Sequence, residues 1–246
     1  ASRPVRHEQA HLQLGREALA LGDRSLARES FRRLYYEFSL SAEAAEAERE
    51  LTRLEPAWRS PSPDAFQLEL GRAQRLFGAR RYTDARAAFQ SLRAASTGAD
   101  RARIDLRLAE CDFHLKRYQA ARTALRLYID SGTRDLPEAR YYYLSTLQKI
   151  GQEAEYLRLA KVFVDANADN PLAERVLDEL GTYYILQDAD AKAAAVFQDL
   201  YRRYPSGAVA DRAAWKAGWW LYRNDEYAAA AKIFEAAAVS HRRADY

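Results

Sequence analysis

The first residues arranged for chemistry are the run His7-Glu8-Gln9-Ala10-His11, which has the spacing HExxH. On a helix this spacing places two imidazoles one turn apart on one face, with a glutamate placed to polarise a metal-bound water. A catalytic zinc needs a third protein ligand, and the other two histidines, His114 and His241, are far along the chain. A carboxylate such as Glu29 could serve, but nothing in the sequence directs it to the pair. We therefore expect exposed helical histidines here, with no metal site and no zinc protease.

A second pattern is aromatic. Trp215, Trp219 and Tyr222 are spaced i, i+4 and i+7, so on a helix they form one continuous face. Arg212 and Glu226 flank them on the same face. Such a face either forms stacking platforms in a groove for a peptide or a sugar, or is covered by helices that are absent from this chain. Both interpretations stay open at this point, and the five residues are candidate binding residues.

The elements that position these side chains are repeated helix pairs. The best copy of the repeat has its characteristic residues at Leu180, Gly181, Tyr184, Ala193, Phe197 and Pro205. These offsets resemble the tetratricopeptide repeat, a pair of antiparallel helices about 34 residues long. Small residues let the two helices approach closely, and such a pair must stack on copies of itself to bury its apolar face. The resemblance implies an all-α, right-handed superhelical solenoid of tetratricopeptide-like helix pairs.

The copies are found by aligning the turn between the two helices of each pair. The turn positions are Tyr82, Tyr118, Ala154, Asp190 and Tyr227, of which the first four are 36 residues apart. The pair around Ala154 fits poorly, because its second helix has Leu157 where alanine is usual and Lys161 where an aromatic is usual. On this alignment the aromatic face of the last pair lines the concave groove, and Phe113 and Tyr142 occupy the corresponding surface in earlier pairs.

The N-terminal part departs from the regular repeat. One early copy is followed by an extra segment from Ser41 to Glu55, rich in helix formers and opened by a serine suited to capping. Three prolines between Glu55 and Asp64 then predict a loop. We therefore divide the chain into residues 1–60, an N-terminal repeat plus an extra helix, and residues 61–246, about five tetratricopeptide-like pairs.

Composition limits the function classes. Thirty-eight basic and 35 acidic residues give a net charge of +3, which is too balanced for a nucleic-acid-binding chain. Neither phosphate-binding glycine motif, G-x-x-x-x-G-K-[ST] or G-x-G-x-x-G, is present, so we expect no cofactor. The single cysteine, Cys111, is expected in the core. The chain has no methionine, so we expect a processed or excised product from which a signal peptide could have been removed.

The segment from Asp211 to Ala238, DRAAWKAGWWLYRNDEYAAAAKIFEAAA, resembles the α-superhelical region of soluble lytic transglycosylases of the bacterial periplasm. In that family, helical repeats precede a catalytic domain that cleaves peptidoglycan. The catalytic motifs E-S-x-F, G-L-M-Q and A-Y-N do not carry over, so the chain alone should be no enzyme, although its parent could be one. The resemblance implies a periplasmic, non-catalytic scaffold that positions a glycan strand. The alternative is a stand-alone adaptor, cytoplasmic if not exported, that holds a protein or peptide partner in its concave groove.

Overall fold

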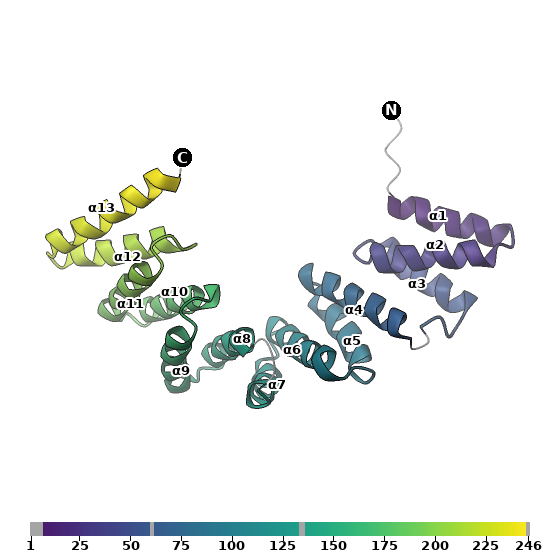
Figure 1. The fold of residues 1–246 in the computed structure, drawn as a ribbon, viewed down its shortest axis with the longest axis horizontal. Coiled ribbons are helices and arrows are strands. Elements are labelled where there is room, and N and C mark those ends of the chain that lie inside the picture. The colour runs from purple at the N-terminus through teal and green to yellow at the C-terminus, as the bar shows by residue number, and fades with distance from the viewer. Residues whose placement is uncertain (1–6, 60–61, 133–135, 245–246) are drawn as a thin grey trace. The chain divides into compact units, whose positions relative to one another are not determined.

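The structure, a computed structural model, describes residues 7–59, 62–132 and 136–244, with side chains as far as residue 239. These residues form thirteen α-helices and no strand (Figure 1). The helices are α1 (His7–Ala20), α2 (Arg24–Glu37), α3 (Glu43–Leu54), α4 (Pro63–Gly78), α5 (Tyr82–Arg93), α6 (Gly98–His114), α7 (Tyr118–Asp130), α8 (Leu136–Lys149), α9 (Glu153–Ala166), α10 (Pro171–Leu186), α11 (Asp190–Arg203), α12 (Ala210–Arg223) and α13 (Tyr227–Ala244). The chain divides into two compact units, Ala1–Tyr128 and Ile129–Tyr246. The predicted all-α solenoid of helix pairs is confirmed.

One turn geometry recurs in six helix pairs. Two residues before each second helix, the backbone takes a left-handed conformation with φ between 53° and 81°. The N–H of the following residue then donates to the carbonyl five residues earlier, as from Arg81 to Leu76 at 2.9 Å. This hydrogen bond closes the end of the first helix in the manner of a Schellman motif. The six left-handed residues are Gly22, Arg80, Lys116, Gly151, Asp188 and Asp225.

Within a pair, the two helices meet where a small residue of the first faces a large one of the second. A Cβ atom on Gly181 would lie 2.7 Å from the ring of Phe197, sixteen residues further on. The same relation holds for Gly15 with Phe31 and for Gly218 with Phe234, at 2.4 and 2.6 Å. The close approach predicted at Gly181 is therefore confirmed, and the same sixteen-residue offset recurs in three pairs.

The pair α8–α9 requires a correction. The alignment on Ala154 is wrong by one residue, because α9 begins at Glu153, two residues after the left-handed Gly151. The buried face of α9 is consequently Tyr156, Ala160, Phe163 and Val164, whereas Leu157 is partly buried and Lys161 is exposed. Relative to the other second helices the sizes are exchanged: Tyr156 stands where they carry alanine, and Ala160 where they carry phenylalanine or leucine.

The extra helix expected after the first pair is α3, and the Ser41 hydroxyl accepts a hydrogen bond from the Ala44 N–H at 3.2 Å, as a capping serine does. After α3 the chain folds back, and Trp58 inserts into the core edge-on to Tyr35, with ring centroids 5.0 Å apart. The predicted division at residues 60 and 61 lies outside the described residues. Among the described helices, none has the length and apolar character needed to span a membrane.

Candidate functional site

The predicted aromatic face of α12 is present and exposed. Trp215, Trp219 and Tyr222 are 57%, 46% and 52% exposed. The opposite face of α12 consists mostly of alanine and glycine and is buried. The indoles of Trp215 and Trp219 are nearly parallel, with centroids 6.0 Å apart, and Tyr222 continues the stack 5.8 Å from Trp219. The small residues of α12 thus pack against the neighbouring helices, while its large aromatic residues face solvent.

The stack extends onto α13 through Tyr227, which the sequence analysis did not select. Its ring meets Tyr222 edge-on at 5.3 Å and is 55% exposed. The Tyr227 hydroxyl donates to Asp225 at 2.5 Å, and this hydrogen bond raises the pKa of Tyr227. We call these four residues, Trp215, Trp219, Tyr222 and Tyr227, the aromatic ladder.

The geometry of the aromatic ladder determines what it can bind. Successive rings are nearly parallel with centroids 5.8 to 6.0 Å apart, a separation at which offset rings leave part of their faces uncovered. The end rings make further contacts: Trp215 meets Phe234 at 5.7 Å, and Tyr222 meets Tyr227 at 5.3 Å. From Trp215 to Tyr222 this apolar strip is about 10 Å long, at ~1.5 Å per residue. A contiguous exposed apolar strip is typical of an interaction surface.

The two charged candidates behave differently. Arg212 is tied to α10: it donates to Asp178 at 2.6 Å and to the Thr182 hydroxyl at 2.8 Å. It therefore links α10 to α12 rather than offering a free guanidinium. Glu226 is exposed at the start of α13, directly before Tyr227.

The remaining two candidates are not joined to the aromatic ladder. Phe113, on α6 in the first unit, packs edge-on against His114 and Tyr118 at 5.4 and 5.8 Å. Tyr142, on α8 in the second unit, meets Tyr141 edge-on at 5.4 Å. Both are partly buried in local aromatic contacts. Their place in a common binding surface stays a prediction.

The HExxH run lies at the start of α1. His7 is exposed, and the ring of His11 packs against Phe38 at 5.7 Å. Across the part of the chain that the structure describes, no group of three histidine, cysteine or acidic side chains is arranged to hold a metal. Cys111 is fully buried, as expected of a core residue, and burial raises its pKa to about 12.

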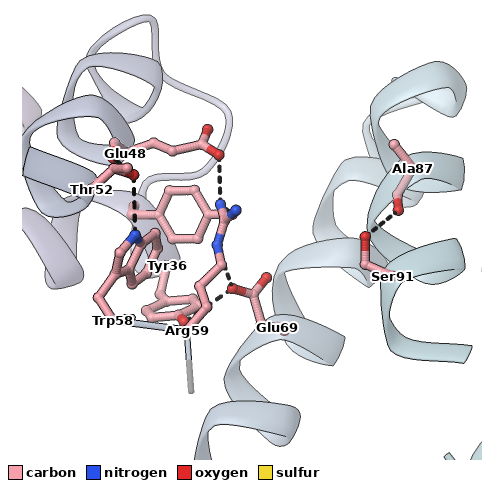
Figure 2. Close-up of polar contacts among 9 residues, drawn as sticks. Tyr36, Glu48, Thr52, Trp58, Arg59, Glu69, Ala87 and Ser91 are labelled. Atoms are coloured by element: carbon pink, nitrogen blue, oxygen red, sulfur yellow. Dashed lines mark hydrogen bonds and ion pairs between the residues drawn. The ribbon is translucent and has the colours of Figure 1, made fainter. Parts of the chain in front are cut away.

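A second candidate site, missed by the sequence analysis, is a cavity of about 1020 Å³ within the first unit. We call it the unit-1 groove. Helices α2, α3 and α4 and the segment after α3 form one wall, and α5 forms the other (Figure 2). The first wall carries Tyr35, Glu48, Arg59, Glu69 and Arg72. The second carries Asp84, Ala87, Ala88 and Ser91 of α5, and Ala95 from the turn that follows it.

Arg59 organises the first wall. Its guanidinium donates to Glu48 of α3 at 2.6 Å and lies 3.4 Å from Glu69 of α4 (Figure 2). It also donates to the Tyr35 hydroxyl at 2.5 Å. It also lies over the indole of Trp58, 4.6 Å from the ring centroid. Burial, followed by the charge of Glu69, raises the pKa of Tyr35 to about 12, so this hydroxyl stays protonated. The wall is thus preorganised by a charge network, which repeat offsets do not reveal.

The comparisons with known proteins agree with the helix pairs. The tetratricopeptide repeat family matches residues 76–144. The chain carries tetratricopeptide-like repeats. No curated protein matches it.

Several solved structures share the fold. A MamA double mutant (RS-1 ArsTM) has a TM-score of 0.54 at 18% identity, covering 73% of this chain and 96% of its own. A putative kinesin light chain of Podosopora anserina with TPR-like repeats has a TM-score of 0.53 at 14% identity, covering 74% and 98%. The Rap conjugation gene regulator of plasmid pLS20, in complex with the Phr* peptide, has a TM-score of 0.52 at 9% identity, covering 97% and 76%. At these identities the likeness establishes the fold alone.

Proposed function

We propose that the chain is a non-catalytic helical-repeat scaffold that binds an apolar segment of a protein partner along the aromatic ladder. The observation that carries this proposal is the exposure of four large aromatic rings in one continuous row, three stacked and one edge-on, at 46% to 57% each. The rings contact each other, and the buried alanine and glycine face of α12 fixes the helix that carries them. Because the rings are already ordered, little side-chain entropy is lost when a partner covers them. The Rap regulator, which shares the fold, is in complex with a peptide.

A second candidate is the glycan-positioning region of a periplasmic lytic transglycosylase. It is supported by the nearly parallel indoles of Trp215 and Trp219, because indole rings also stack on sugar rings, and by the resemblance of the segment from Asp211 to Ala238. In this proposal a catalytic domain elsewhere in the parent protein cleaves the strand, and the chain itself has no activity. The two proposals use the same rings and differ in the ligand.

The test compares two variants in titrations with apolar peptides and with soluble muropeptides. Trp219→Ala removes the middle ring, whereas Leu186→Ala trims an exposed apolar side chain of the same unit outside the ladder. Loss of one aromatic contact is worth about 0.5–1.5 kcal/mol, so Trp219→Ala should weaken binding about twofold to twelvefold. Leu186→Ala should leave it unchanged.

The ligand that responds to Trp219→Ala decides between peptide and glycan. If neither ligand responds, both proposals fail. If light scattering also shows that wild-type self-association decreases in this variant, the ladder packs against further protein rather than binding a free ligand.

A further inference from the structure

The unit-1 groove lies where the series of helix pairs is incomplete. Helix α3 packs against α1 and α2, and α4 packs against α2 and α5. After α3 the described residues up to Ser62 form turns and loop rather than a second helix. The groove therefore takes the space beside α3 that a partner helix would fill. At a helix diameter of ~10 Å and a rise of ~1.5 Å per residue, about 1020 Å³ accommodates roughly two turns.

The α5 wall is shaped for close approach of a backbone. Ala87, Ser91 and Ala95 are spaced by four residues, all are exposed, and all line the groove. The Ser91 hydroxyl donates to the Ala87 carbonyl at 3.0 Å, so it is already satisfied within α5 (Figure 2). This stripe presents only small side chains to an occupant.

The facing wall carries a cation, Arg72, that pairs with no carboxylate among the described residues. The Arg72 guanidinium stacks over the Tyr35 ring, 4.1 Å from its centroid. Its Nε is buried, and none of the described residues accepts a hydrogen bond from it. Arg59 beside it is neutralised by Glu48 and Glu69. A partly buried guanidinium always keeps its charge and is stabilised by a carboxylate that accepts its hydrogen bonds.

The rim of the groove has the opposite sign. Asp64 is exposed in the first turn of α4, Asp100 is partly buried in the first turn of α6, and both line the groove. Asp84, a third rim carboxylate, pairs with Arg81 at 2.7 Å. An occupant that complements these charges has an acidic residue in its middle and basic residues toward its ends.

We propose that the unit-1 groove binds an amphipathic helix of a partner protein, and that one carboxylate of this helix pairs with Arg72. The helix completes the pair that α3 leaves open. It lays a small apolar face on the stripe of Ala87, Ser91 and Ala95, and its basic ends lie near Asp64 and Asp100. This site is separate from the aromatic ladder and does not depend on the proposed function.

The test uses two stapled, fluorescein-labelled alanine-leucine helices of three turns with a lysine at each end. One has a central glutamate and the other a glutamine at the same position. We expect the glutamate peptide to bind the wild-type chain about tenfold more tightly, as for a charge-assisted pair. Arg72→Gln should abolish the difference between the peptides. Arg81→Gln, the matched change at the rim, should retain it.

Two further variants separate this site from a folding defect and from the ladder. Ser91→Trp fills the groove from an exposed position of α5, so it should prevent binding of both peptides without altering the circular dichroism spectrum. Trp219→Ala should not affect either peptide. Equal binding of the two peptides, no binding of either, or binding that survives Ser91→Trp would overturn the proposal. If wild-type dimers disappear in Ser91→Trp, the occupant is a second copy of the chain, and the proposal is wrong.

Discussion

The contact between Gly181 and Phe197 allows a quantitative test of the helix seam. A methyl group added at position 181 would lie 2.7 Å from Cζ of Phe197, which is 1% exposed and cannot move aside freely. Overpacking of this kind destabilises by ~1–3 kcal/mol, while alanine in place of glycine in a helix interior stabilises by ~0.8–1.0 kcal/mol. We therefore expect Gly181→Ala to lower the free energy of unfolding by about 1 kcal/mol, measured by urea denaturation.

Another helix pair of this chain has a larger residue in place of the glycine and a smaller one in place of the phenylalanine. In α6 and α7, Ala109 and Leu125 stand at the same sixteen-residue offset, and both are buried. Phe197→Leu alone should destabilise, since it removes buried ring atoms. The double variant Gly181→Ala/Phe197→Leu should recover part of this loss, because the smaller leucine leaves room for the added methyl group. We expect a coupling energy of about 1 kcal/mol or more between the two substitutions. If the two single effects add within ~0.5 kcal/mol, Gly181 and Phe197 do not determine the approach of α10 and α11.

Three further predictions concern the turns, a buried tyrosine and the cysteine. Lys116→Gly should raise the free energy of unfolding by ~0.5–1 kcal/mol, measured by urea denaturation. The left-handed φ of 60° costs a residue with a side chain ~1–2 kcal/mol, and the greater backbone entropy of unfolded glycine offsets about half of that gain. A loss of stability would contradict this prediction. Burial raises the pKa of Tyr35 from 10.0 to about 12, so the folded chain keeps a proton that the unfolded chain releases. The free energy of unfolding should thus fall as pH rises from 10 to 12, and Tyr35→Phe should flatten this decline; an unchanged slope would refute the burial of this hydroxyl. Cys111, 0% exposed, should react with a maleimide only after unfolding, and rapid labelling of the native chain would show that the core opens.

The repeated seams and turns could be predicted from the sequence because each depends on a local offset. The close approach of Gly181 to Phe197 and the helix starts at Tyr82, Tyr118, Asp190 and Tyr227 follow from residues within one pair. The register error in α9 arose where the sizes of the seam residues are exchanged. Gly151 was the available signal, since it takes the same left-handed place before α9 that Gly22 takes before α2.

Of the candidate sites, one could be predicted from local sequence patterns and the other could not. The shared face of Trp215 and Trp219 was predictable, because it needs only helical periodicity. The unit-1 groove could not be predicted from the sequence. Arg59 pairs with Glu48 and Glu69 from two different helices, and the repeat pattern does not specify these pairings. The environment of Arg72 was not predictable either, since burial of its Nε depends on how α4 lies against Tyr35.

The most direct test of the central claim, that the aromatic ladder is the face that binds a ligand, is fluorine NMR of the chain labelled with fluorotryptophan. The chain has four tryptophans, and Trp58, which is 6% exposed in the other unit, serves as an internal control. On titration with the apolar peptide or the muropeptide, the resonances of Trp215 and Trp219 should shift together while that of Trp58 stays in place. A ligand that binds without moving the Trp215 and Trp219 resonances, or that moves Trp58 alone, would contradict the account.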